Sequence, residues 1–307
     1  MNQSITFSLF AVIAILLSAC STKPLALKMT AEPSNKYVYR SENMTETNIS
    51  VMGMDQKVMV EQSTDQEYDI QKVNADGSMD IKLTTLSMKM EQVNPMMSMT
   101  FDSENPDKNE PAEMVEGMKA LVGKEYELKM SPKGKILDLD TKGGVFSGAF
   151  DNMPNGELME QQMEAQFGAE TIKQSMSQMT GFFPDEPVKV GDTWTKSNKV
   201  EAGMAMLVET TYTLRERKDG TAFIDFNAKV TSDPDAKGIE MMGMQMQYDL
   251  AGTQSGTIQV DEKTGWTKET KGKQEMKGKM NMSGGPTGEM SADMEVLSEY
   301  TYKRIEK

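Results

Sequence analysis

Apolar and polar residues alternate with a period of two from Lys36 to about Gln92. This period predicts β-strands, in which successive side chains point to opposite faces. Asp76-Gly77 separates two such runs, and Asp-Gly is a strong hairpin signal because glycine accepts the positive φ that the turn needs. The apolar residues that share one face of the predicted hairpin are Tyr68, Ile70, Met79, Ile81 and Leu83.

Helical spacing appears in two places between the strand regions. A short amphipathic helix is predicted within 112–123, after a proline-containing loop at 101–111. A second hairpin follows and turns at 131–134. Residues 155–179 place their apolar side chains about four apart, which predicts one or two amphipathic helices. These helices should be interrupted near Gly168 and end at the sequence GFFP, residues 181–184.

The pattern of the first hairpin returns in the last third of the chain. Residues 212–230 align with residues 68–86, with one residue fewer before the turn. The matched residues are Tyr212 with Tyr68, Leu214 with Ile70, Asp219-Gly220 with Asp76-Gly77, Ile224 with Ile81, and Phe226 with Leu83. This repeat predicts a mainly β (α+β) fold in which a helical segment joins two antiparallel β-rich halves of a duplicated curved sheet or half-barrel. The expected parts are 36–141, 142–187 and 188–307.

The N-terminus carries an apolar run from Phe7 to Leu17, followed by Ser18, Ala19 and Cys20. The run is too short to span a bilayer and is typical of a secretory signal peptide. The sequence LSAC resembles the lipobox of bacterial lipoproteins, although no Lys or Arg precedes the apolar run.

The lipobox resemblance has consequences for location. It implies that the lipoprotein maturation machinery removes residues 1–19 and attaches a diacylglyceryl group and a further acyl chain, such as palmitate, to Cys20. Residues 20–35 would then be a flexible tether to the membrane, which is held through the acyl chains. Ser21 resembles the residue found in lipoproteins sorted to the outer membrane, which implies a lipid anchor there, facing the periplasm.

Charge and composition exclude several classes of function. The chain has 47 acidic and 33 basic residues, a net charge of −14 and no basic cluster, which argues against nucleic-acid binding. Histidine is absent and Cys20 is the only cysteine, so Ser–His and Cys–His nucleophiles cannot form. Carboxylates are plentiful, but their spacing singles out no acid–base pair. We therefore expect no enzymatic activity and no cofactor.

Methionine is unusually frequent, with 31 residues, and many are two positions apart. Residues two apart share one face of a strand, so each pair would place two thioethers side by side. Three interpretations remain open: flexible core packing, a groove for an apolar ligand, and Cu(I) coordination by soft thioether ligands. The pairs are Met52/Met54, Met88/Met90, Met97/Met99, Met204/Met206, Met242/Met244/Met246 and Met280/Met282. Copper is the least favoured, because the pairs are scattered and no histidine accompanies them.

One strand shows the one-sided pattern most clearly. Met242, Met244, Met246 and Tyr248 share a face between Gly238 and Leu250, and the opposite face is largely polar. Trp194 follows a glycine turn at the start of another predicted strand. These five residues form the candidate apolar-ligand face: Met242, Met244, Met246, Tyr248 and Trp194.

The sequence PVKVGDTW at 187–194, taken with the lipobox and the repeated hairpins, resembles a family of bacterial lipoproteins of unknown function. The resemblance implies no catalytic residues. In outline the chain is also similar to carriers that move lipoproteins and lipids across the periplasm. The hypothesis is a non-enzymatic, lipid-anchored envelope lipoprotein that binds an apolar small molecule or lipid on a Met-lined sheet face. The alternatives are a structural or protein-interaction lipoprotein with a filled core and, as a minor one, Cu(I) binding.

Overall fold

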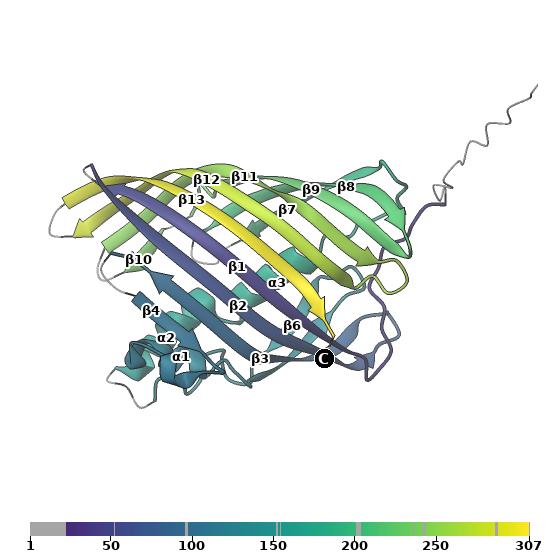
Figure 1. Ribbon diagram of the computed structural model, residues 1–307, viewed down its shortest axis with the longest axis horizontal. Coiled ribbons are helices and arrows are strands. Elements are labelled where there is room, and N and C mark those ends of the chain that lie inside the picture. Colours follow the sequence, from purple (N-terminus) through teal and green to yellow (C-terminus); the bar gives the residue numbers. More distant parts are fainter. Residues whose placement is uncertain are drawn as a thin grey trace, which may run out of the picture.

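A computed structural model describes residues 23–51, 53–95, 98–151, 153, 155–200, 204–236, 238–241, 244–285 and 288–306. Within these residues, thirteen strands form one antiparallel sheet (Figure 1). The strands are β1 (Lys36–Val51), β2 (Met54–Val73), β3 (Met79–Val93), β4 (Ser98–Asp102), β5 (Glu125–Met130), β6 (Ile136–Asp140), β7 (Thr193–Val200), β8 (Met206–Lys218), β9 (Thr221–Ser232), β10 (Ile239–Met241), β11 (Met244–Asp261), β12 (Thr267–Gly285) and β13 (Gly288–Ile305). The predicted mainly β fold is confirmed.

The two β-rich halves are joined edge to edge into a single sheet. The strand order is β6-β5-β3-β2-β1-β13-β12-β11-β9-β8-β7, with β4 paired to β3 and β10 paired to β11. Strands β1 and β13 pair antiparallel from Val38 with Ile305 to Ser50 with Asp293, so the first and last strands form the seam between the halves. Apart from the short strands β4 and β10, consecutive strands of each half are neighbours, as in a meander.

The two aligned hairpins have the same pairing register. Tyr68 lies opposite Leu83 in β2–β3, and Tyr212 lies opposite Phe226 in β8–β9. Both ladders also have an irregularity near the turn, between Ile70 and Lys72 in one hairpin and between Leu214 and Glu216 in the other. Equivalent residues therefore occupy equivalent places in the sheet, as the sequence alignment predicts. The turn glycines have the positive φ expected of them, 80° at Gly77 and 71° at Gly220.

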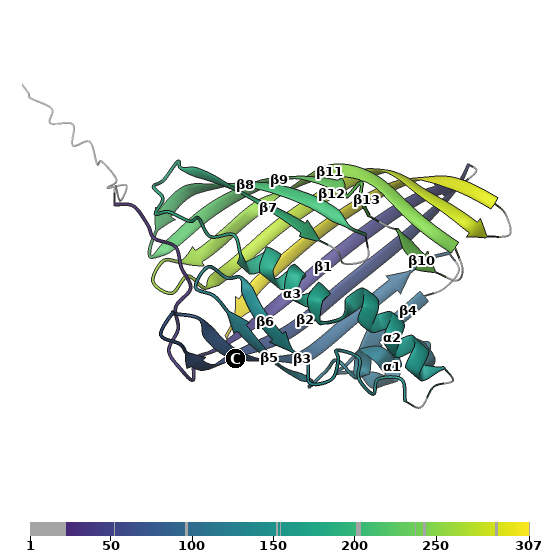
Figure 2. The same cartoon turned by 180° about the vertical axis from the view of Figure 1, so that it is seen from behind.

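The helices lie on one side of the sheet, where it is open. They are η1 (Pro106–Lys108), α1 (Ala112–Lys119), α2 (Gly156–Phe167) and α3 (Ala169–Thr180). The break between α2 and α3 falls at Gly168, as predicted. Helix α3 contacts both β6 and β7, which are the two edge strands of the sheet (Figure 2). The sheet therefore curls around α3, and its inner face forms a trough that this helix partly closes.

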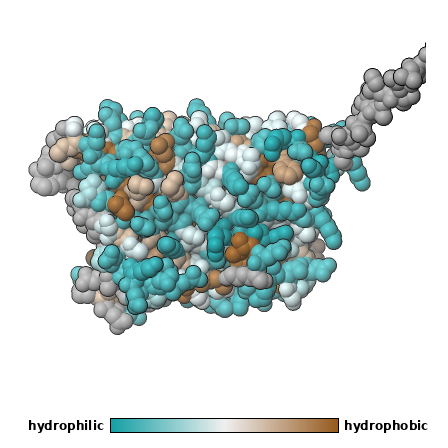
Figure 3. All heavy atoms as spheres, in the orientation of Figure 1, coloured by the Kyte–Doolittle hydropathy of each residue, from teal (hydrophilic) through white to brown (hydrophobic). Residues whose placement is uncertain are grey.

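The two faces of the sheet differ in character. On β12, buried and partly buried residues alternate with exposed lysines, because side chains point alternately into the trough and out to solvent. The pattern places Met276 and Met280 inside, whereas Lys277 and Lys279 point outward. The outer face seen in Figure 3 is mostly hydrophilic. The trough is thus the apolar side of a one-sided sheet.

The largest cluster of buried residues fills the end of the trough near the aligned hairpins. Tyr39 stacks on Tyr302 across the β1–β13 seam, with ring centroids 4.5 Å apart. Leu25, Leu27 and Met29 also belong to this cluster, with exposed fractions of 8%, 1% and 4%. The sequence interpretation of 20–35 as a flexible tether therefore needs correction for its described residues. Backbone hydrogen bonds between Leu25 and Val188 and burial of the alternating apolar side chains fix this segment.

Candidate ligand-binding site

Two cavities lie inside the trough, beneath helix α3. The first, here called the threonine cavity, has a volume of about 360 Å³ and is lined by β1, β2, β3, β5 and the segments around α3. The second, called the tyrosine cavity, has a volume of about 200 Å³ and lies under the β8–β13 part of the sheet. The cavities adjoin across the seam, because Ser41 of the first lies opposite Tyr302 of the second.

One wall of the threonine cavity is polar but uncharged. These residues point inward because they alternate with outward-facing charged or polar residues along their strands. Ser41 and Thr64 lie opposite each other on β1 and β2, and Thr64 is 7% exposed. Among the described residues, the Thr64 Oγ1 is buried without a hydrogen-bond partner. The polar wall consists of Ser41, Gln62, Thr64, Gln66 and Thr85.

The opposite wall of the threonine cavity is apolar. Val145 and Phe146, in the loop before α2, are 1% and 4% exposed. The loop is held by two groups: the backbone N–H of Phe146 donates to a carboxylate oxygen of Glu164, and the Lys124 amine donates to the carbonyl oxygens of Gly144 and Val145, both at 2.8 Å. The apolar wall consists of Leu83, Met88, Leu121, Tyr126, Val145, Phe146 and Ile172.

Burial changes the acid–base behaviour of two groups beside this cavity. Desolvation, with a smaller contribution from the charge of Glu164, raises the pKa of Tyr126 to about 12. Desolvation also lowers the pKa of Lys124, against the opposing effect of Glu164 and Glu160. The cavity wall therefore presents Tyr126 as a neutral phenol, and the nearby ammonium group is already bound to backbone carbonyls.

In the tyrosine cavity, unlike at Thr64 in the threonine cavity, polar side chains hydrogen-bond to each other. The Gln254 side-chain N–H donates to the Tyr300 hydroxyl at 2.7 Å, and both residues line the cavity. The Tyr300 ring lies over Gly272 of the neighbouring strand, where an added Cβ would be 2.3 Å from a ring carbon. The absence of a side chain at Gly272 therefore leaves room for the Tyr300 ring in the trough. Burial raises the pKa of Tyr300, so its hydroxyl stays protonated at neutral pH.

Side chains of helix α3 line both cavities. Ile172 lines the threonine cavity, while Gln178 and Met179, about two turns further on, line the tyrosine cavity. The C-terminal end of the helix is fixed by the Thr180 hydroxyl, which donates to the Gly134 carbonyl of the β5–β6 turn. Just beyond it, the Trp194 indole N–H donates to the Phe182 carbonyl at 2.7 Å. Both edges of the sheet thus anchor the same helix end.

The structure places Trp194 and Tyr248, two of the five candidate residues, in different clusters. Trp194 packs beside Tyr212 in the large core cluster, whereas Tyr248 packs against a second cluster further along β11. Met246 lies opposite Met282, and the backbone of Met244 belongs to β11. Cys20 and Met242 lie outside the described residues. The second cluster consists of Met206, Val208, Ala228, Val230, Leu250, Met276 and Val296.

The methionines have a packing role at this second cluster. Met206 and Met276 are 7% and 3% exposed among aliphatic side chains from five neighbouring strands. Their flexible thioether chains fit the irregular gaps inside the curled sheet. The threonine cavity, by contrast, has Met88 as its one methionine among the described lining residues. The sequence hypothesis does not include this polar wall, although β2 carries a signal: uncharged polar residues alternate with charged ones in Thr64-Asp65-Gln66-Glu67.

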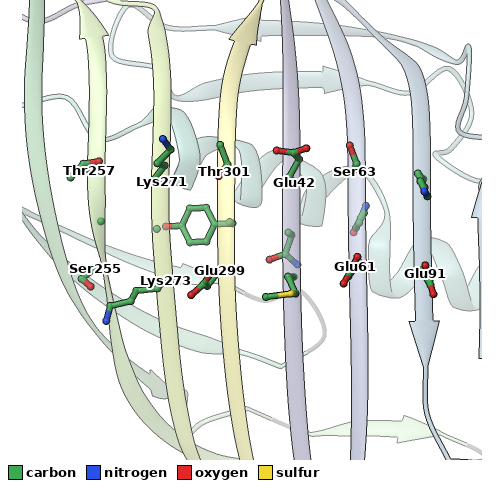
Figure 4. A pocket seen from close by; sticks show the side chains of 17 residues that line it. Glu42, Glu61, Ser63, Glu91, Ser255, Thr257, Lys271, Lys273, Glu299 and Thr301 are labelled. Atoms are coloured by element: carbon green, nitrogen blue, oxygen red, sulfur yellow. The ribbon is translucent and has the colours of Figure 1, made fainter.

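The largest hollow among those described lies on the other side of the sheet. It has a volume of about 890 Å³ and is shallow, formed where the twisted central strands dip along their length. Figure 4 shows its side chains in front of the strands, with the helix behind the sheet. Glu42, Glu61, Glu91, Lys271 and Lys273 are among them. This charged, solvent-facing surface does not suit an apolar ligand.

The described part of the chain has neither a metal-binding cluster nor a membrane-spanning helix. Its residues contain no group of three or more His, Cys, Asp or Glu side chains placed to hold a metal ion. None of its helices combines the length and the apolar character needed to cross a membrane.

Among the comparisons with known proteins, the one with lipovitellin agrees with the fold. A model of a family of unknown function (DUF6263) matches residues 76–267. Lipovitellin, in a structure concerned with its lipid–protein interactions, aligns with a TM-score of 0.51 and 10% identity over 90% of this chain and 25% of its own. The outer membrane protein OprG from Pseudomonas aeruginosa aligns with a TM-score of 0.21 and 8% identity, over 91% of this chain and 100% of its own. No curated protein matches the sequence.

Proposed function

The chain belongs to this family of unknown function, and we propose that it is a non-enzymatic, lipid-anchored protein of the cell envelope that binds an apolar, lipid-like molecule in the trough. The threonine cavity is the main observation that supports this proposal. Its volume of about 360 Å³ falls within the range of small-molecule sites, which begins near ~300 Å³. A structural protein with a filled core would have no need of such a space beneath its helix.

The cavity walls also have the composition of a lipid site. Aromatic and aliphatic side chains form one side, and a few convergent polar groups lie opposite, which is the usual arrangement in pockets for small molecules. Helix α3 covers the site and contacts both edge strands, β6 and β7, so it can exclude water from a bound chain. The likeness to lipovitellin adds modest support, because it concerns the fold and this chain spans a quarter of that protein's length.

The anchoring part of the proposal rests on the sequence. Cys20 follows a lipobox-like sequence, and acyl chains on this residue would hold the trough at a membrane surface, from which lipids could be taken up. Ser21 favours the outer membrane, facing the periplasm. The non-enzymatic part rests on the composition, since the absence of histidine and of a second cysteine leaves few nucleophiles.

Native mass spectrometry of the chain from residue 21 onward tests the binding function. This form keeps every strand and helix described above. We expect a lipid-like mass to remain bound after purification, and to be lost in an Ile172→Trp variant, whose larger side chain fills the threonine cavity.

Leu207→Trp is the matched control, because Leu207 lies on the outer face of β8 and is 40% exposed. This variant should keep the bound mass. If the unsubstituted protein carries no lipid and takes up none from detergent-solubilised bacterial membranes, the binding proposal fails. A structural or protein-interaction role with a filled trough would then be the better account.

A further inference from the structure

We propose that the ligand is a neutral acyl ester or long-chain alcohol whose polar group hydrogen-bonds to Thr64 inside the threonine cavity. This inference rests on the proposed function and specifies the chemistry of the same site. It begins from the Thr64 Oγ1, which is buried on a 7% exposed residue and lacks a partner among the described residues. A buried hydroxyl without a hydrogen bond destabilises a protein, so such groups are rare unless something else satisfies them.

The position of Thr64 points to a ligand as its partner. The residue lines the cavity on the trough side of β2, between Ser41 on β1 and Met88 on β3. Elsewhere in the trough, polar side chains satisfy one another, as Gln254 and Tyr300 do in the tyrosine cavity. Thr64 differs because its side chain lines a space large enough for a guest, and the apolar wall opposite makes that space suitable for an acyl chain.

Because the described lining of the threonine cavity carries no charged side chain, we expect its ligand to have a neutral headgroup. The described lining residues include Ser, Thr and Gln side chains but no Lys, Arg, Asp or Glu. A buried phosphate or carboxylate would need a cation, because an unpaired ion in a low-dielectric site is very costly. The ammonium group of Lys124, beside the loop that carries Val145 and Phe146, already donates to the carbonyl oxygens of Gly144 and Val145, and Glu164 lies beside the same loop.

Hydroxyl and ester groups match this polar wall in hydrogen-bonding capacity. The Thr64 hydroxyl can donate to an ester carbonyl or accept from an alcohol, and the amides of Gln62 and Gln66 can do both. The acyl chain would lie against the apolar wall, and the tyrosine cavity across the seam offers more space for it.

Three probes with the same alkyl chain length test the headgroup: a monoacylglycerol, the free fatty acid at a pH above its pKa, where it is ionised, and the alkane. Affinities for the chain from residue 21 onward are measured by displacement of a fluorescent lipid. We expect the monoacylglycerol to bind most tightly. If the alkane binds as tightly, or the fatty acid binds more tightly, the headgroup inference is overturned while the proposed function stands. If none of the three binds, the proposed function fails as well.

A Thr64→Val variant separates a ligand-binding hydroxyl from a structural one. Valine keeps the shape of the side chain and removes the unpartnered oxygen, so the ligand-free variant should unfold at a higher temperature than the parent protein. Its affinity for the monoacylglycerol should fall by about 3- to 10-fold, as expected for one neutral hydrogen bond, while its affinity for the alkane stays unchanged. Thr64→Ser should retain the monoacylglycerol affinity.

The matched control is Thr47→Val, which makes the same change on the trough face of β1 but outside the described cavity lining. It should leave the affinities for both probes unchanged. A Thr64→Val variant that is less stable without ligand, or that binds the monoacylglycerol as well as the parent does, overturns the assignment of Thr64.

Discussion

The indole N–H of Trp194 donates a 2.7 Å hydrogen bond to the backbone carbonyl of Phe182, and this contact joins edge strand β7 to the residues that follow helix α3. Trp194 also stacks on Tyr212, with ring centroids 5.6 Å apart. The sequence places this residue in the candidate apolar-ligand face. Its position instead suggests that it fixes the helix covering the two cavities.

A Trp194→Phe variant should therefore loosen the C-terminal end of α3. Phenylalanine keeps a ring for the stack but leaves the Phe182 carbonyl without its donor, which costs about 1–3 kcal/mol at a buried site. We expect a lower urea midpoint and faster amide hydrogen exchange over 176–183.

Trp266→Phe provides the control, because the Trp266 indole donates to the Thr30 carbonyl, away from α3. It should lower stability without changing exchange in the helix. Unchanged exchange over 176–183 in Trp194→Phe would show that the hydrogen bond does not hold the helix end.

Gly272 should be needed for the place of Tyr300 in the trough. An added Cβ at Gly272 would lie 2.3 Å from the ring, so Gly272→Ala must displace Tyr300. We expect the free-energy cost of Gly272→Ala to fall when Tyr300 is already alanine, with a coupling energy of roughly 1 kcal/mol or more in a double-mutant cycle. Gly252→Ala is the control, since its Cβ would meet the backbone of Glu275 and Met276 instead. Equal costs of Gly272→Ala in both backgrounds would contradict the proposed steric contact.

The repeated hairpins could be predicted because their signals are local. An Asp-Gly turn and alternating apolar residues determine which side of each hairpin is buried, and Tyr68 and Tyr212 occupy the same register in both halves. The seam between β1 and β13 could not be predicted in this way. It joins Val38 to Ile305, and such long-range pairing leaves no local pattern beyond the presence of two strands.

The candidate site was harder to predict than the fold. The methionine pattern predicts a ligand face on the strand that is β11, where the structure shows Leu250 and its neighbours in a packed cluster. The threonine cavity is lined partly by Ser41, Thr64 and Thr85, whose polar side chains resemble surface residues in the sequence. Their inward direction follows from strand register, and the cavity itself depends on where α3 crosses the curled sheet. Neither is encoded in a short motif.

Cys20→Ala should separate anchoring from binding. If Cys20 carries the acyl chains, the variant should lose incorporation of labelled palmitate and leave the membrane fraction. The trough begins beyond this residue, so a soluble form from residue 21 onward should retain its fold and its circular dichroism spectrum. Labelled palmitate on the Cys20→Ala protein would refute the lipobox interpretation. A Ser21→Ala variant, which keeps the cysteine, should remain labelled.

The pKa of Tyr126 predicts how stability changes at alkaline pH. Burial, with a smaller contribution from Glu164, raises the folded-state pKa to about 12 from an ordinary value of 10.0. Because the folded state favours the protonated phenol, this contribution to stability is complete below pH 10 and is lost as the pH rises through about 12. The free energy of unfolding should therefore decrease over this interval more steeply in the parent protein than in Tyr126→Phe.

Ultraviolet absorbance of tyrosinate, taken as the difference between the parent and Tyr126→Phe, isolates this group from the other buried tyrosines. Ionisation should appear near pH 12. Glu164→Gln should move it towards lower pH, because the variant removes the neighbouring negative charge but keeps an oxygen to accept the Phe146 N–H. A difference signal centred near pH 10 in the folded protein would mean that Tyr126 is exposed to water, and the apolar wall of the threonine cavity would then be more open than the structure shows.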